Sequence, residues 1–124
     1  MADTIEELAG TSVLFRSGDG APVRDERDAT DLIGESMFRG AQWVVLPAEC
    51  LPEDFFRLRT RLAGTVVQKF ANYRMGLAVI GDINHHVEAS DSLRDFVRES
   101  NRGTQLWFLS DTEAFRTRLA GLRD

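Results

Sequence analysis

The residues that could do chemistry form two groups: carboxylates that follow apolar strands, and cations on one long helix. Glu49, Asp82 and Asp111 each come shortly after an apolar run that reads as a buried strand. Ligands of open α/β sheets bind beyond the carboxyl ends of the parallel strands, where carboxylate oxygens could hold a hard cation such as Mg²⁺. The alternative is structural, with Asp111 starting the last helix and Asp82 closing a turn. We favour the structural role and expect no metal site.

Residues 52–73 read as a single long helix. At 100° per residue, Arg59 falls inside its apolar stripe and Lys69 lies near the edge of that stripe. An isolated buried charge is costly, so the Arg59 guanidinium either finds a carboxylate such as Asp82 or Glu49, or faces a cleft together with Lys69 and binds an anionic ligand. The candidate ligand-binding residues are Arg59, Lys69, Tyr73, Asp82 and Asp111.

The opposite side of this helix carries polar residues at helical spacing, namely Arg57, Arg61, Gln68 and Asn72. Most rows of this kind are only solvated, but this row is also a candidate surface for a protein partner.

The two histidines and the cysteine have ordinary structural explanations. His85 and His86 are adjacent and lack a third ligand at a recognised spacing, so a loop role is favoured over metal binding. Cys50 has no histidine partner at a fixed spacing and is expected to be a buried small hydrophobe. No residue is predicted to be catalytic, and no cofactor is expected.

The elements that must position these residues alternate between strands and helices. Strands are predicted at residues 12–16, 21–24, 42–46, 75–81 and 105–109, the first two joined as a hairpin through a glycine-containing turn. Helices are predicted at residues 28–38, 52–73, from Ser90 or Ser92 to about residue 100, and 112–122. Residues 1–10 read as a polar lead and residues 11–124 as one domain. The pattern predicts an α/β fold with a mixed, mostly parallel sheet and about four helices.

Composition excludes several classes of protein. The 124 residues fit one domain, and 15 basic against 20 acidic residues give a formal charge of −5. That balance argues against a protein that binds mainly nucleic acid. A single cysteine excludes an intramolecular disulfide. The acidic N-terminus does not resemble a signal peptide, and no apolar run approaches the ~20 residues needed to cross a membrane. We therefore expect a cytoplasmic protein with no membrane contact.

Two resemblances add to this interpretation. The first rests on LPEDFF at 51–56, LAG at 62–64, QKFANYR at 68–74, LAVIGD at 77–82, SLRDF at 92–96 and ESNRG at 99–103. From about residue 11 to residue 122, the chain resembles domain-of-unknown-function family 4180 of bacteria, which implies a small stand-alone cytoplasmic domain. The order of elements also resembles the anti-sigma-factor antagonist (STAS) architecture. There a phosphorylatable serine often opens the helix after the third strand, but residues 49–54 contain no Ser or Thr, and Glu53 and Asp54 supply fixed negative charge instead.

Two functions from different classes remain open. The leading hypothesis is a non-enzymatic interaction or regulatory module that presents the row around Arg57 and Asn72 to a protein partner. The alternative is a domain that binds a small anionic molecule, and is possibly a modest enzyme, with its site at the carboxyl ends of the parallel strands. The identity of the partner and the oligomeric state are not predicted.

Overall fold

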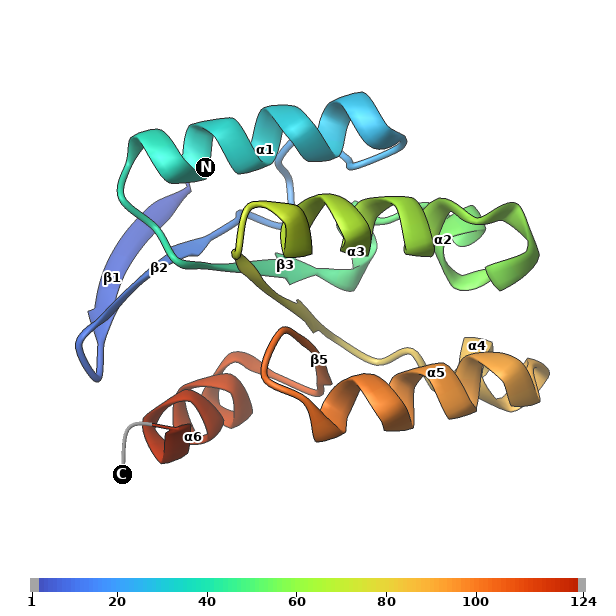
Figure 1. The fold of residues 1–124 in the computed structure, drawn as a ribbon. Coiled ribbons are helices and arrows are strands. Elements are labelled where there is room, and N and C mark those ends of the chain that lie inside the picture. The colour runs from blue at the N-terminus through green and yellow to red at the C-terminus, as the bar shows by residue number, and fades with distance from the viewer. Residues whose placement is uncertain (1–2, 123–124) are drawn as a thin grey trace.

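A five-stranded sheet with helices on both faces makes up the computed structural model, which describes residues 3–122 (Figure 1). The strands follow one another in sequence order across the sheet. They are β1 (Thr4–Leu8), β2 (Thr11–Phe15), β3 (Trp43–Pro47), β4 (Gly76–Ile80) and β5 (Leu106–Leu109). The first pair is antiparallel and the remaining pairs are parallel. The predicted α/β fold with a mixed, mostly parallel sheet is confirmed.

The chain begins with the predicted hairpin, but its two strands differ from the predicted pair. β1 comes from the residues expected to be a polar lead, and Ile5 pairs with Leu14 of β2. Ala9 and Gly10 join the two strands with φ of 52° and 82°, and this is the pair of positive φ values that a two-residue hairpin turn requires. Residues 21–24, predicted as the second strand, are irregular.

The helix predicted for residues 52–73 is divided into three pieces. They are α2 (Glu53–Phe56), the 3₁₀ turn η2 (Leu58–Thr60) and α3 (Leu62–Asn72). Arg57 is extended and Arg61 is left-handed (φ 68°). The Thr60 hydroxyl lies 2.6 Å from the carbonyl oxygen of Asp54 and 2.8 Å from that of Arg57, so it competes for backbone groups that a continuous helix would use. The break moves Arg59 out of the predicted apolar stripe, and its side chain is exposed.

The remaining helices are α1 (Glu26–Phe38), α4 (Asn84–Ala89), α5 (Asp91–Arg102) and α6 (Thr112–Leu122), and one further 3₁₀ turn spans Ala48–Cys50. Residues 3–122 therefore contain six α-helices rather than the predicted four or so. Ser90, not Ser92, caps α5, because its hydroxyl accepts a hydrogen bond from the Leu93 N–H at 3.1 Å.

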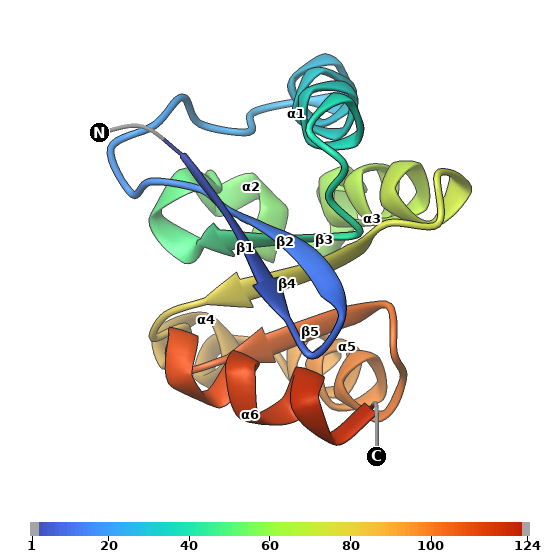
Figure 2. The ribbon, with the colours of Figure 1, turned by 90° about the vertical axis from the view of Figure 1, so that its left-hand side faces the viewer.

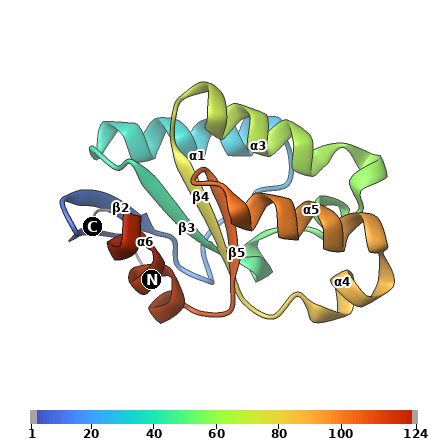
Figure 3. The ribbon, with the colours of Figure 1, turned by 60° about the horizontal axis from the view of Figure 1, so that its bottom comes forward.

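Each face of the sheet has its own core. One core packs Leu14, Val44, Leu77 and other strand residues against α1, α3 and α5. In Figure 2 these three helices follow one another down one side of the sheet. The other core places Phe115 and Leu119 of α6 against the second face, and Figure 3 shows α6 on the side away from α1 and α3. Burial on both faces explains why β3 and β4 read as continuous apolar runs rather than alternating ones.

An ion pair ties α6 to the edge strand β1. Arg116 donates two hydrogen bonds to the Glu6 carboxylate, at 2.8 and 3.1 Å. These bonds hold the pKa of the Glu6 carboxyl below its usual value. Both side chains remain about a third exposed, so the pair is expected to stabilise the fold by no more than about 1 kcal/mol.

The Glu6–Arg116 pair should make stability depend on pH. Because folding lowers the pKa of Glu6, the ion-paired carboxylate stabilises the fold fully above the ordinary glutamate pKa of about 4.3. That stabilisation disappears as the pH falls through the lower value of the folded state. Urea unfolding should therefore give a lower free energy of unfolding for Glu6→Gln than for the wild type at neutral pH, and this difference should disappear in acid. A difference of the same size at all pH values would contradict this role of the pair.

Candidate functional site

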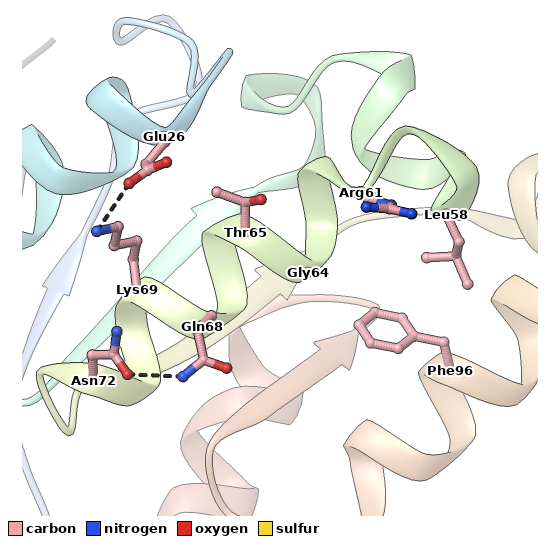
Figure 4. Close-up of a pocket in the computed structure, with 9 residues that line it drawn as sticks. All are labelled: Glu26, Leu58, Arg61, Gly64, Thr65, Gln68, Lys69, Asn72 and Phe96. Atoms are coloured by element: carbon pink, nitrogen blue, oxygen red, sulfur yellow. Dashed lines mark hydrogen bonds and ion pairs between the residues drawn. The ribbon is translucent and has the colours of Figure 1, made fainter.

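The helical face of the molecule contains a hollow of about 640 Å³ between α1, α3, η2 and α5, which we call the α3 groove. It is lined by Glu26, Leu58, Arg61, Gly64, Thr65, Gln68, Lys69, Asn72 and Phe96. Figure 4 shows the apolar side chains of Leu58 and Phe96 near the start of α3, with Arg61 beside Leu58. Amide side chains lie toward the end of the helix, where Gln68 donates a hydrogen bond to Asn72 at 2.8 Å. The groove therefore combines an apolar end with a hydrogen-bonding end.

The structure brings together three of the four residues of the predicted partner surface. Arg61, Gln68 and Asn72 all line the α3 groove. Arg57 does not, because the break before α3 turns it toward α2. There its guanidinium lies 3.1 Å from a carboxylate oxygen of Glu53.

The predicted ligand-binding residues do not form one site. Lys69 lines the α3 groove and pairs with Glu26 of α1 at 2.9 Å, whereas Tyr73 is exposed at the end of α3. Asp111 accepts a hydrogen bond from the Ala114 N–H at 2.8 Å, at the start of α6. Asp82 accepts one from the Asn84 N–H at 2.9 Å, within the turn that follows β4. The described residues contain no group of three or more His, Cys, Asp or Glu side chains placed to hold a metal ion.

Arg59, the fifth of these residues, lines a second hollow of about 610 Å³ between α2, η2 and α4. An adjoining hollow of about 350 Å³ shares Glu53, Phe56, His85 and His86 with it and continues to the carboxyl ends of β3 and β4. We call the two together the histidine cleft. His85 and His86 were predicted to lie in a loop, but they lie on α4 and line both parts of this cleft.

The His86 imidazole is held in a stack of rings. It lies nearly parallel to the Phe56 ring with the ring centres 4.2 Å apart, and the centre of the His85 ring is 3.8 Å from that of His86, with the two planes tilted by 40°. Burial lowers the pKa of His86, and the neighbouring His85 lowers it further. The neutral form is therefore favoured near pH 7, with one ring nitrogen able to donate and the other able to accept a hydrogen bond.

Cys50 has the environment of a structural residue. It is 2% exposed, and its thiol points toward the carbonyl oxygen of Ser17 at 3.6 Å. Burial raises the pKa of this thiol, which disfavours the reactive thiolate. The expectation of a buried small hydrophobe agrees with this geometry.

One segment of the chain has a basic composition that the total charge does not reveal. Between Asp54 and Asp82 the chain contains no carboxylate side chain, yet it carries Arg57, Arg59, Arg61, Lys69 and Arg74. Averaging charge over the whole chain hides this segment, because the formal total is −5. A count of charges in windows of about 25 residues would have revealed it. The segment includes η2 and α3, and two of its cations, Arg61 and Lys69, line the α3 groove.

The described residues form a single α/β domain with an open mixed sheet. The chain belongs to the family described as "Domain of unknown function (DUF4180)", whose model matches residues 8–119. No curated protein matches the chain, and no solved structure matches it. The expected STAS-like order of elements is therefore not confirmed by these comparisons. Within residues 3–122, none of the helices combines the length and apolar character that crossing a bilayer requires.

Proposed function

We propose that this chain is a non-enzymatic interaction module that binds an acidic segment of a partner protein in the α3 groove. The observation that carries the proposal is the basic surface of η2 and α3, which contribute no carboxylate in an otherwise acidic protein. Among the residues that line the groove, the one carboxylate is that of Glu26 on α1, and it is paired with Lys69, so Arg61 supplies the charge there that no described residue compensates. An acidic segment is the complement of this surface in charge, and such complementarity speeds association and selects the partner.

Two cations of this surface, Arg59 and Arg61, differ from those of α5 in their pairing. Along α5, Arg94, Arg98 and Arg102 each pair with a carboxylate three residues earlier in the chain. By contrast, Arg59 and Arg61 have no ion-pair partner among the described residues. An exposed guanidinium without an internal carboxylate keeps its five donors available for an incoming one. We therefore assign to Arg61, at the apolar end of the α3 groove, the first contact with a carboxylate of the partner.

The shape and chemistry of the groove favour a polypeptide occupant. A Cβ added at Gly64 would meet no atom within 4 Å, so a partner backbone can approach α3 closely at that point. Leu58 and Phe96 offer apolar contact beside Arg61, and the amides of Gln68 and Asn72 can donate to and accept from a peptide backbone. The 11 residues of α3 span about 16 Å, which matches about five extended residues or three turns of helix.

The direct test is photo-crosslinking in cells that naturally make the protein. A photoreactive amino acid placed at Gln68 should give a crosslink that maps to an acidic stretch of a partner protein. The same amino acid at Thr117, exposed on α6, is the matched control and should not give it. Mass spectrometry of the crosslinked peptide then shows whether the partner segment is acidic, which the capture of a partner alone would not show.

Charge reversal at Arg61 gives the second part of the test. Arg61→Glu should lower the crosslink yield about tenfold or more and leave the free energy of unfolding within about 0.5 kcal/mol of wild type, because the side chain is exposed and unpaired. Arg27→Glu, at an exposed arginine of α1, should leave the yield unchanged. A crosslink to nucleic acid, to a second copy of this chain or to a segment without acidic residues would contradict the proposal.

A further inference from the structure

The histidine cleft is chemically distinct from the α3 groove and is separated from it by η2. Leu58 lines both hollows, while Arg61 lines only the α3 groove and Arg59 only the histidine cleft. The volumes of the two parts of the cleft, about 610 and 350 Å³, lie in the range that small-molecule sites occupy. The cleft is therefore large enough to hold a metabolite.

Charge is divided between the two ends of the cleft. At the η2 end, Arg57 is neutralised by Glu53 and Asp54, so Arg59 supplies the charge that is not compensated within the described residues. At the strand end, Glu49 and Asp82 line the wall, and neither forms an ion pair among the described residues. An anionic group is therefore attracted to the η2 end and repelled from the strand end.

Donors for an oxyanion surround Arg59. Ser90 and Ser92 add hydroxyl groups to the lining, and His85 and His86 add ring nitrogens. The Phe56–His86 stack fixes the His86 ring, so its donor is held in place before a ligand arrives. His85 is exposed and its ring lies beside that of His86, with the centres 3.8 Å apart and the planes tilted by 40°, so aromatic rings form the middle of the cleft.

From this arrangement we infer that the histidine cleft binds a small organic molecule through a phosphate or carboxylate group. Arg59 binds the oxyanion, the hydroxyls and imidazoles donate to it, and the body of the ligand lies over the ring stack. This corrects the location expected from the strand ends: Asp82 lines the wall opposite the anion, while Lys69, Tyr73 and Asp111 lie outside the cleft. The inference is independent of the docking proposal, since it uses neither Arg61 nor α3.

Side-chain NMR of the two imidazoles tests the inference with simple probes. Purified protein is titrated at constant pH with sodium phosphate and, separately, with sodium acetate, and sodium chloride at matched ionic strength serves as the control for salt. The resonances of His85 and His86 should shift and reach saturation with at least one oxyanion and not with chloride. The oxyanion that binds more tightly identifies the group that the cleft prefers.

Two arginine variants make the result specific to the cleft. Arg59→Gln should weaken the binding of the preferred oxyanion about tenfold. The Arg59 side chain is exposed and forms no ion pair with any residue of 3–122, so its replacement should not unfold the protein. Arg27→Gln, which removes an exposed charge on α1, should bind as the wild type does. The inference is overturned if neither oxyanion gives saturable shifts, or if Arg59→Gln binds with wild-type affinity.

Discussion

Replacing Gly76 with alanine should lower the free energy of unfolding by at least about 3 kcal/mol, the largest effect that we expect from any single methyl group in this protein. A Cβ at this position would lie within 2.6 Å of three carbons of the Trp43 indole. Trp43 cannot move aside, because its rings pack against Trp107 at 4.4 Å and against Phe115 at 5.7 Å between centres. The cost arises on the α6 side of the sheet, where these aromatic side chains form the core.

Gly34 provides the matched control for this substitution. It lies inside α1, and a Cβ added there would meet no atom within 4 Å. Gly34→Ala should therefore stabilise the protein by about 0.5–1 kcal/mol through helix propensity alone. Urea unfolding followed by circular dichroism measures both variants. If Gly76→Ala unfolded within 1 kcal/mol of wild type, the close contact between β4 and Trp43 described above would be wrong.

Removing the side chain of Asn101 should cost about 2–3 kcal/mol. β5 is the last strand of the sheet, so one side of its backbone lacks a neighbouring strand. The Asn101 amide fills that place at Phe108, where it accepts a hydrogen bond from the N–H at 2.7 Å and donates one to the carbonyl oxygen at 3.2 Å. In Asn101→Ala, both backbone groups lose their partner in a partly buried setting, and unpaired groups of this kind are expensive.

The matched control for Asn101 is another asparagine amide with a different environment. The Asn72 amide is exposed and bonds to the exposed Gln68 side chain, so Asn72→Ala should change the free energy of unfolding by less than about 0.5 kcal/mol. Asn101→Asp keeps the acceptor and loses the donor, and it should fall between wild type and Asn101→Ala. Equal stability of Asn101→Ala and Asn72→Ala would show that the edge of β5 does not need the amide.

The parallel strands could be predicted from the sequence because burial on both faces leaves a continuous apolar run. The runs at residues 42–46, 75–81 and 105–109 correspond to β3, β4 and β5, and the helix predicted at residues 28–38 corresponds to α1. These elements depend on patterns of several residues. A single atypical residue within such a pattern does not change the element that the pattern predicts.

The errors arose where single backbone conformations decide the structure. Ala9 has a positive φ in the β1–β2 turn, and alanine gives no signal for such a conformation. Arg61 has a positive φ as well and, with the Thr60 hydroxyl, divides the predicted long helix. Helical periodicity was then extended through the break, which is why Arg59 was placed on the core side although it is exposed.

The candidate sites also differ in how far the sequence predicts them. Arg61, Gln68 and Asn72 were predicted as one surface, and the structure places all three in the α3 groove because two of them share the intact part of the helix and the third precedes it. The histidine cleft could not be assembled from sequence. It brings Phe56 of α2 against His86 of α4, and β4 lies between these two helices along the chain. The contact depends on the turn that separates α2 from α3.

The most direct test of the docking proposal is a charge exchange between the two binding partners. Once crosslinking at Gln68 has mapped an acidic segment, the affinity of that segment is measured with wild-type protein and with Arg61→Glu. Both forms are then measured again with the acidic residue nearest to Arg61 in the complex changed to arginine. Each single reversal should weaken binding about tenfold or more, and the double reversal should restore most of the affinity. A double reversal that binds no better than the single reversals would contradict the proposal that Arg61 recognises an acidic partner in the α3 groove.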